Sequence, residues 1–380
     1  MKRFYRLLKD YLRKSDTFLL VTCIISTLYG IVLIASATSY TGSMRAAYVQ
    51  IIALFCGIFL YFIFSVLDID ILADRWKLLF LFSVVFILAL IPFGVEGNSG
   101  NKAWIRFAGI GIQPAEVVKI TFIILLAKLI THLQERHGLS HVWSVAQLVA
   151  FCGFMFALII VVSSDLGSAL VYAFIFAVML YIAGLKFYWF LIGGGALAAI
   201  APIVWNHFLT DRQKERILAP YDPTIDPTGL GIKWQPNQSK AAISSGGLFG
   251  RGLFNGSYTQ SGSVPHQETD FVFSAAGEEL GLIGCAVIIL LLTIIIVRCV
   301  YIGIKSNHSL GSLVCIGIAA MLAFQTCENI GMCLGLTPVI GLTLPFFSYG
   351  GSSIITMFAA MGIVSGIKMK PRPSRFTQIK

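Results

Sequence analysis

Charged residues are scarce in this chain of 380 residues: Asp, Glu, Lys and Arg together make up 12%, about half the share found in soluble domains. Hydrophobic residues make up 57%, and a single soluble core of this size cannot hide so much apolar surface from water. The same composition excludes a disordered, collagen-like or coiled-coil chain. It therefore predicts a membrane protein that crosses the bilayer several times.

Paired cysteines and spaced metal ligands are also missing. None of the 8 cysteines belongs to a CxxC motif, and all lie in apolar stretches, as small buried hydrophobic residues do. The 6 histidines show no ligand spacing, and neither the GxxxxGK(S/T) nor the GxGxxG phosphate-binding motif occurs. We therefore expect no metal site and no cofactor, although a requirement for a divalent cation stays open. The net charge of +10 indicates loops that face anionic lipid rather than a nucleic-acid partner.

Apolar runs long enough to cross a bilayer, about 20 residues each, occur ten times. They lie near 17–37, 46–66, 77–94, 114–131, 143–162, 166–184, 187–208, 271–298, 310–336 and 345–367. Ser163, Ser164 and Asp165 interrupt the fifth and sixth runs and predict a tight turn at one membrane face. The expected fold is an all-α polytopic membrane protein that forms a single domain over residues 1–380.

Lys and Arg are concentrated in the tails and short loops on one side of these spans, which indicates the cytoplasmic side. Ten spans place both termini there, so 1–16 and 368–380 are expected to be basic cytoplasmic tails close to membrane lipids. The segment 209–269, between the seventh and eighth spans, then lies outside the cell. Its apolar residues predict a packed lid rather than a free linker. These residues are Trp234, Leu248, Phe249, Leu253, Phe254 and Tyr258.

Ionisable residues at membrane depth are costly and mark candidate functional sites. Pro114 suits the first position of a helix, and Glu116 and Lys119 then share one face. They form either a structural ion pair or a charged pocket just under the outer surface. Just upstream, the basic and aromatic residues Lys102, Trp104 and Arg106 are either an ordinary interfacial anchor or a clamp for an anionic lipid headgroup.

Two aspartates lie at the starts of later spans. Asp165 is either a helix N-cap or a functional carboxylate. At 100° per residue, Ser274, Gly277 and Gly281 share the helix face of Asp270. Such a face either packs closely on another helix or lines a wet cavity, and the leading carboxylate favours the cavity. A third alternative is that Asp270 is only a helix N-cap.

The last span begins with the irregular stretch 344–353, which contains Pro345, Ser348 and two glycines. It is either a broken helix beside a substrate or a kinked packing helix. The residues thus indicate a helical bundle with an outward-facing polar cavity. A transporter and an enzyme acting on a lipid-linked substrate both fit this description.

Several stretches, in the same order along the chain, resemble motifs of the RodA/FtsW/SpoVE (SEDS) family. The stretches are Trp104–Arg106, Gln113–Glu116, Asp165–Ala169, Gln238–Gly247, Thr269–Gly281 and Leu344–Ser353. The corresponding family motifs are WIRxG, QPSE, PDLGTA, QSKIAIGSGG, HTDFIF with GEELG, and LPFISYGGSS. Lys240 and the run 216–218 look more like the elongation branch, RodA, than the division branch, FtsW.

The resemblance implies a peptidoglycan glycosyltransferase that polymerises lipid II at the outer face of the cell membrane, beside a class B penicillin-binding protein. Its role would be in cell elongation and shape, division or sporulation. Asp270 would be the catalytic general base of an inverting transfer. The substrate-binding residues would be Trp104, Arg106, Glu116, Lys119, Asp165, Lys240 and Ser348. Arg106, Lys119 and Lys240 would offset charge on the leaving pyrophosphate, while Glu116 and Asp165 would orient Lys119 or the acceptor.

The chain departs from the family pattern close to Asp270. Glu268 replaces the usual His, and Val264-Pro265-His266 replaces Leu-Pro-Glu. The extra carboxylate of Glu268 is expected to raise the pKa of Asp270. A flippase of the lipid-linked precursor and a non-catalytic scaffold remain as alternatives, and only the enzyme requires the Asp270 carboxylate for glycan synthesis.

Overall fold

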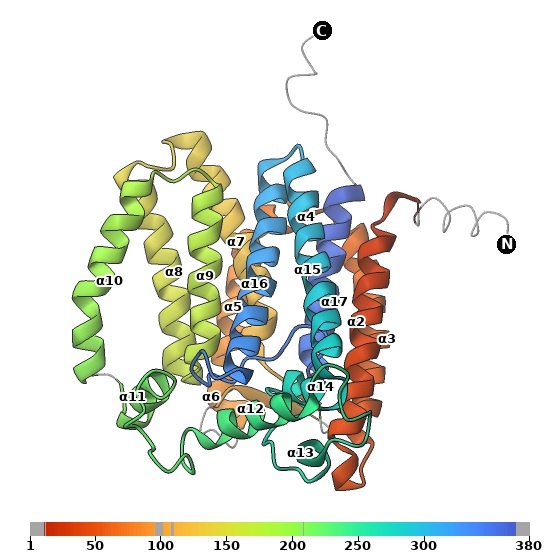
Figure 1. The fold of residues 1–380 in the computed structure, drawn as a ribbon. Helices are drawn as coiled ribbons and strands as arrows, with labels where there is room; N and C mark the ends of the chain where they lie inside the picture. The colour runs from red at the N-terminus through yellow and green to blue at the C-terminus, as the bar shows by residue number, and fades with distance from the viewer. Residues whose placement is uncertain (1–10, 12, 96–101, 108–109, 208, 370–380) are drawn as a thin grey trace, which may run out of the picture.

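The structure is a computed structural model that describes residues 11, 13–95, 102–107, 110–207 and 209–369. Long helices form a bundle, with most of the short helices gathered at one end and α4 at the other (Figure 1). The long helices are α2 (Thr17–Ala37), α3 (Arg45–Val66), α5 (Trp76–Leu88) continued by α6 (Leu90–Phe93), α7 (Pro114–Arg136), α8 (Val142–Ser163), α9 (Leu166–Ile182), α10 (Phe187–His207), α15 (Gly281–Lys305), α16 (Ser309–Cys333) and α17 (Gly351–Met369). The short ones are the 3-10 turn η1 (Ser39–Thr41), α4 (Ile69–Asp74), α11 (Asp211–Leu218), α12 (Trp234–Gly246), α13 (Ser257–Gln260) and α14 (Val272–Glu279).

Eight helices of the described chain are long and apolar enough to cross a membrane: α2, α3, the α5–α6 unit, α8, α10, α15, α16 and α17. The apolar α9 is shorter, and α7 carries Glu116, Lys119 and Lys128 within its length. The prediction of a helical multi-pass membrane protein is confirmed. The count of ten crossings stays a prediction.

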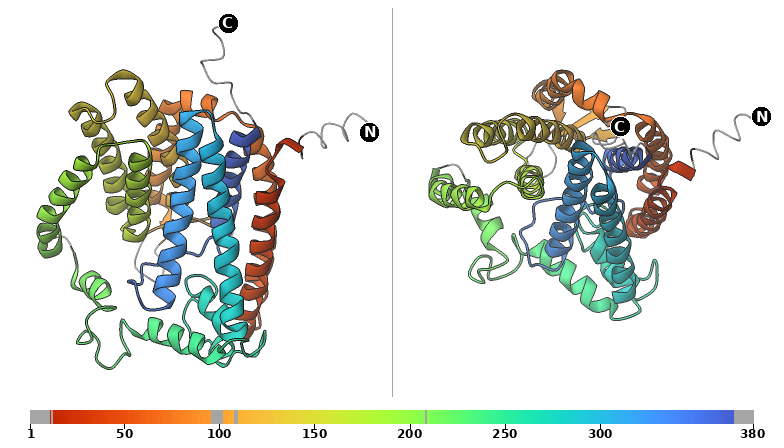
Figure 2. Two further views of the ribbon diagram at one scale, coloured as in Figure 1. Left: turned by 45° about the horizontal axis from the view of Figure 1, so that its top comes forward. Right: turned by 90° about the horizontal axis from the view of Figure 1, so that it is seen from above.

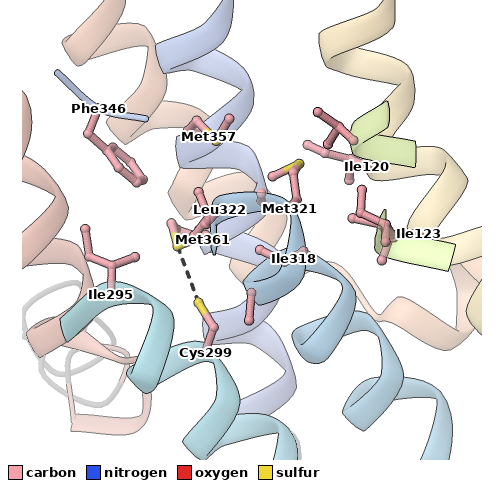
Figure 3. Packing of buried hydrophobic residues seen from close by; sticks show 14 of the residues in the cluster. Ile120, Ile123, Ile295, Cys299, Ile318, Met321, Leu322, Phe346, Met357 and Met361 are labelled. Atoms are coloured by element: carbon pink, nitrogen blue, oxygen red, sulfur yellow. Dashed lines mark hydrogen bonds between the residues drawn. The ribbon is translucent and has the colours of Figure 1, made fainter. Parts of the chain in front are cut away.

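The centre of the bundle is built from α16 and α17. In each of these helices, 78% of the apolar stretch that could cross the membrane is buried inside the protein. Side chains of α7, α15, α16 and α17 meet there, including Ile120, Ile295, Met321 and Met357 (Figure 3). Helix α17 approaches α3 so closely that a Cβ atom at Gly362 would lie 2.6 Å from the carbonyl oxygen of Tyr61. Small residues at such crossings let two backbones touch in lipid. By contrast, α10 has no buried side chain and lies at the edge of the bundle (Figure 2).

Local capping explains one predicted turn and corrects one predicted span. Helix α8 ends at Ser163 and is followed by Ser164, whose φ is 53°, and Asp165 caps α9, so the predicted tight turn is confirmed. The prediction of one continuous helix over 271–298 is wrong, because the chain breaks between α14 and α15. Gly281 there has a φ of 68°, and a Cβ atom on it would lie 2.4 Å from the amide nitrogen of Gly250. Only glycine adopts this conformation so close to another backbone.

A small antiparallel sheet, absent from the predicted fold, lies between α6 and α7. Its strands are β1 (Gly94–Val95), β2 (Trp104–Phe107) and β3 (Ile110–Ile112), in the order β1-β2-β3. Ile105 of β2 pairs with Gly94 on one side and Ile112 on the other. The predicted interfacial stretch is therefore a strand, and Trp104 and Arg106 lie on one face of it because side chains alternate along a strand.

The 209–269 segment lies at the end of the bundle opposite the start of α2 and the end of α17 (Figure 1). Its predicted packing through apolar residues is wrong in part, since Leu248 and Phe249 are 61% and 79% exposed. Carboxylates secure it instead. Glu278 accepts hydrogen bonds from the amides of Tyr258 and Thr259 at 2.9 and 2.8 Å. The neighbouring carboxylate of α14, at position 279, likewise accepts hydrogen bonds from α2 and α13.

Candidate functional site

Asp270 lies in the turn that leads into α14, and its backbone is attached to α16. The side-chain nitrogen of Asn329 donates to the carbonyl oxygen of Asp270 at 2.8 Å and to that of Leu342 at 2.7 Å. Asn329 is fully buried. One amide group therefore joins the Asp270 turn to the loop between α16 and α17.

The carboxyl group of Asp270 is half-buried and faces this loop. A Cβ atom at Gly341, whose φ is 73°, would lie 3.5 Å from Oδ2 of Asp270. Burial raises the pKa of Asp270, and the charge of Glu268 raises it further, while His266 and the hydroxyl of Thr269 lower it. The direction predicted for Glu268 is confirmed, although burial is the larger cause.

Ser348 fixes the same turn from the other side. Its hydroxyl donates to the carbonyl oxygen of Thr269 at 2.5 Å and accepts from the amide of Leu344 at 2.8 Å. The amide of Tyr349 donates to the carbonyl oxygen of Glu268 at 2.8 Å. Ser348 is 3% exposed, so the structure gives it the role of positioning the backbone beside Asp270.

The prediction that Asp270 shares a helix face with Ser274 and Gly277 is wrong. Asp270 precedes α14, whose N-cap is Phe271, so it does not share a helix face with Ser274 and Gly277. Ser274 hydrogen-bonds Ser239 of α12, and a Cβ atom at Gly277 would lie 2.9 Å from the side chain of Ile243. The prediction that this face lines a wet cavity is wrong, because the face packs against α12.

Glu116 and Lys119 form a buried ion pair near the start of α7. Nζ of Lys119 lies 2.5 Å from Oε1 of Glu116, and Lys119 and Glu116 are 0% and 4% exposed. Oε2 of Glu116 has no hydrogen-bond partner within the described chain. This geometry favours the structural ion pair over an open charged pocket.

The Asp165 carboxylate accepts three hydrogen bonds. Its oxygens accept from the amide of Ser168 at 2.9 Å, from the Ser168 hydroxyl at 2.7 Å and from the side chain of Gln113 at 2.9 Å. The Tyr172 hydroxyl also donates to the carbonyl oxygen of Ala115. Asp165 therefore caps α9 and ties it to the start of α7.

The α16–α17 loop runs between these two groups of acids. A Cβ atom at Gly167, two residues after Asp165, would lie 2.8 Å from the carbonyl oxygen of Ile340. The next residue, Gly341, faces Asp270. Asp165 and Asp270 therefore both lie close to the loop between α16 and α17, near its consecutive residues Ile340 and Gly341.

A pocket of about 220 Å³ opens where α11 and α12 meet the first part of this loop. Arg216, Lys233 and Lys240 line it together with Thr337 and Val339, and no acidic residue does. Lys240 alone of the predicted site residues belongs to this lining.

The pocket is close to Asp270, although that carboxylate does not line it. Val339 is two residues from Gly341, a separation of at most about 7 Å along the backbone.

Trp104 and Arg106 lie apart from these groups. Arg106 is exposed on β2, and Trp104 is half-buried, with its ring 3.1 Å from where a Cβ atom of Gly111 would be. None of the hydrogen bonds within the described ranges links either residue to the Asp270 turn. The structure leaves both available at the surface.

Sequence reasoning missed Asn329, Glu278 and two cations of the pocket. Asn329 is a polar residue on a buried helix face, and that pattern was a usable signal. The roles of Glu278, Arg216 and Lys233 depend on partners far away in the chain, so their local sequence carries no comparable signal.

Fold and site together define the class: a multi-pass helical membrane protein with a half-buried carboxylate close to a basic pocket at one end of the bundle. The chain belongs to the FtsW/RodA/SpoVE family, since the model of that family, described as "Cell cycle protein", matches residues 16–372.

Known members share most of the chain's length. A probable peptidoglycan glycosyltransferase FtsW of Trichlorobacter lovleyi is 34% identical over 378 residues, which cover 95% of this chain and 96% of the relative. A chain from a peptidoglycan synthase complex, solved to show the structural coordination of polymerization and crosslinking, aligns with a TM-score of 0.78 at 30% identity, over 93% of this chain and 97% of that one. The crystal structure of the rod shape determining protein RodA of Thermus thermophilus aligns with a TM-score of 0.70 at 27% identity, over 95% and 98%. The FtsW relative and the RodA structure both match this chain over 95% of its length. The closer resemblance to RodA therefore stays a prediction.

Proposed function

We propose that this protein is a peptidoglycan glycosyltransferase that polymerises lipid II at the outer face of the cell membrane. The observation that carries the proposal is Asp270: its backbone is fixed by Asn329, while the residue stays partly exposed. The activity named for the FtsW relative and the polymerization ascribed to the synthase complex support the same function.

Asp270 acts as the general base. It accepts the proton of the acceptor sugar hydroxyl while that oxygen attacks the anomeric carbon of the donor. The bond from this carbon to the diphosphate oxygen breaks, and its electron pair leaves with the isoprenyl diphosphate. A positioned base contributes about 10²–10⁴-fold, and it works best when its pKa is close to the operating pH. The raised pKa of Asp270 moves it in that direction.

The other predicted residues divide into two roles. Lys240, Arg106 and Trp104 are exposed or half-buried, so we assign them to contacts with the substrate. Glu116 and Lys119 are buried and paired, so they stabilise the start of α7 instead of touching substrate. Asp165 and Ser348 position the loop and the turn around Asp270, and no cofactor enters this scheme.

The same proposal sets the orientation in the membrane. The 209–269 segment covers the outer face of the single domain. The start of α2 and the end of α17 face the cytoplasm, where the basic tails meet anionic lipid. A class B penicillin-binding protein is the proposed partner. The similar synthase complex is described as coordinating polymerization with crosslinking, which supports this assignment.

The test is glycan synthesis from lipid II by the purified protein in nanodiscs, with the partner added. Wild type is expected to form polymer and Asp270→Asn to form none while unfolding at the same temperature. Asp211→Asn, which alters a carboxylate that is 96% exposed on α11, is the matched control and should keep full activity. Normal polymer from Asp270→Asn would disprove the base, and lipid II translocation that survives this variant would favour a carrier.

A further inference from the structure

The basic pocket between α11, α12 and the α16–α17 loop has no role in the scheme above beyond Lys240. Arg216 comes from α11, Lys233 directly precedes α12, and Lys240 lies on α12. Three cations around about 220 Å³ repel one another unless an anion lies between them.

The protein itself leaves most of this charge uncompensated. The side chains of Arg216 and Lys240 form no ion pair or hydrogen bond with any part of the described chain. Arg216 is half-buried, and burial together with neighbouring Arg212 lowers its pKa. Lys233 donates to the backbone carbonyl of Asp222 at 2.7 Å. The Asp222 carboxylate accepts hydrogen bonds from the amide and hydroxyl of Thr224, and these bonds together with the nearby charge of Lys233 lower its pKa. Asp222 therefore offsets part of the charge of Lys233, while Arg216 and Lys240 stay uncompensated.

A glycine makes room for the Lys240 side chain in the pocket. Gly335, at a φ of 69°, is the residue against which the Lys240 side chain lies. A Cβ atom there would be 3.3 Å from Nζ and 3.2 Å from Cδ. The missing side chain lets the lysine extend along the α16–α17 loop.

The ligand chemistry follows from these groups. A guanidinium fork and ammonium groups together suit phosphoryl oxygens, which accept several charge-assisted hydrogen bonds. The remaining wall is largely apolar and includes Pro220, Ile232, Pro236 and Val339. An anion that carries an apolar or sugar substituent fits both parts of the wall better than a free ion does.

We propose that this pocket binds the diphosphate group of the isoprenyl-linked sugar donor, with Arg216 and Lys240 as its principal ligands. The assignment rests on the proposed function. The loop that forms one wall of the pocket continues within two residues to Gly341, which faces Asp270. The donor carbon can therefore lie between the departing diphosphate and the base, as an inverting displacement requires.

Binding of inorganic pyrophosphate tests the pocket without any turnover. The Asp270→Asn protein is placed in nanodiscs of zwitterionic lipid, and the dissociation constant of pyrophosphate is measured by thermophoresis. Arg216→Gln and Lys240→Gln, each combined with Asp270→Asn, are expected to weaken binding by about tenfold or more, because each removes a charge-assisted contact. Lys214→Gln, on α11 but outside the pocket, is the matched control and should leave the constant unchanged. Equal affinity in all variants would overturn the proposal.

A variant that keeps the positive charge separates an effect on binding from an effect on folding. Arg216→Lys keeps the charge and should bind within a few-fold of the parent. If Arg216→Gln unfolds at a lower temperature, the comparison of Lys240→Gln with Lys214→Gln decides, since Lys240 is exposed. Loss of binding in Lys214→Gln to the same extent would show a diffuse charge effect and contradict the site.

Two sources of phosphoryl groups are separated by competition. Undecaprenyl diphosphate in zwitterionic nanodiscs should displace pyrophosphate, whereas phosphatidylglycerol in place of the zwitterionic lipid should change its affinity less than twofold. Displacement by phosphatidylglycerol alone would make the pocket a site for lipid headgroups and overturn the donor assignment. If wild type makes no glycan yet undecaprenyl diphosphate competes as expected, the proposed function fails while the pocket assignment stands.

Discussion

The acids on the two sides of the α16–α17 loop are fixed in opposite ways. Glu116 and Asp165 have buried carboxylates that are bonded to Lys119, Ser168 and Gln113, and of their oxygens only Oε2 of Glu116 lacks a partner within the described chain. At Asp270 the protein bonds the backbone to α16, while the carboxyl group stays partly exposed and interacts with the hydroxyl of the adjacent Thr269. A carboxylate held by several distant side chains stabilises the fold, whereas one that keeps an accessible oxygen is available for chemistry. The comparison therefore separates structural from reactive carboxylates within one site.

The largest expected effect tests the structural side of this comparison. Lys119→Met would leave Glu116 buried without its partner, and breaking a buried ion pair costs about 3–5 kcal/mol. Chemical denaturation in detergent would show a free energy of unfolding lowered by this amount. Lys128 lies on the same helix as Lys119 and forms an exposed pair with Asp74 of α4. Lys128→Met breaks that pair and should cost less than about 1 kcal/mol. If Lys119→Met were as stable as wild type but inactive, the Glu116–Lys119 pair would have a role in the reaction and not in stability.

A smaller effect tests how Asp270 is positioned. Asn329→Ala removes both hydrogen bonds that join the Asp270 turn to the α16–α17 loop. Displacing a catalytic group by about 1 Å can cost about 10²-fold, so kcat should fall by about that factor while KM changes little.

Thr326→Ala, on the same helix, is the control for Asn329→Ala. The Thr326 hydroxyl is buried and bonds to nothing among the residues described, so kcat should stay near the wild-type value. Equal losses in the two variants would indicate a general weakening of α16.

The smallest effect concerns pH. Burial and Glu268 raise the pKa of Asp270, and the base must be deprotonated to act, so activity should fall as the pH drops through this raised pKa. The midpoint should lie above the value of about 3.9 for a free aspartate. Glu268→Gln removes a like charge and should shift the midpoint of the acid limb of kcat/KM to lower pH, by less than about one unit. A shift to higher pH would contradict the electrostatic assignment.

Much of the bundle could be predicted from local sequence. Apolar runs give the long helices, and Pro114 and Asp165 mark helix starts because capping acts over three or four residues. The break at Gly281 could not be predicted, since the backbone of Gly250 imposes it. The hairpin around Trp104 was missed because its strands are only a few residues long.

The candidate site divides in the same way. Asp270 and Lys240 were identified through motifs, but how each is held depends on distant contacts. Asn329, which hydrogen-bonds the backbone of Asp270, lies 59 residues from it in the sequence. Gly335, which packs against Lys240 of α12, lies in the distant loop between α16 and α17. Burial decides which charges are structural, and a local pattern does not report burial.

The most direct test of the central claim is the single-turnover rate of glycosidic bond formation, with both lipid II molecules bound to wild type and to Asp270→Asn. The account predicts a rate lower by about 10²–10⁴-fold with binding unchanged, because only the proton acceptor is lost. A rate within twofold of wild type would contradict it.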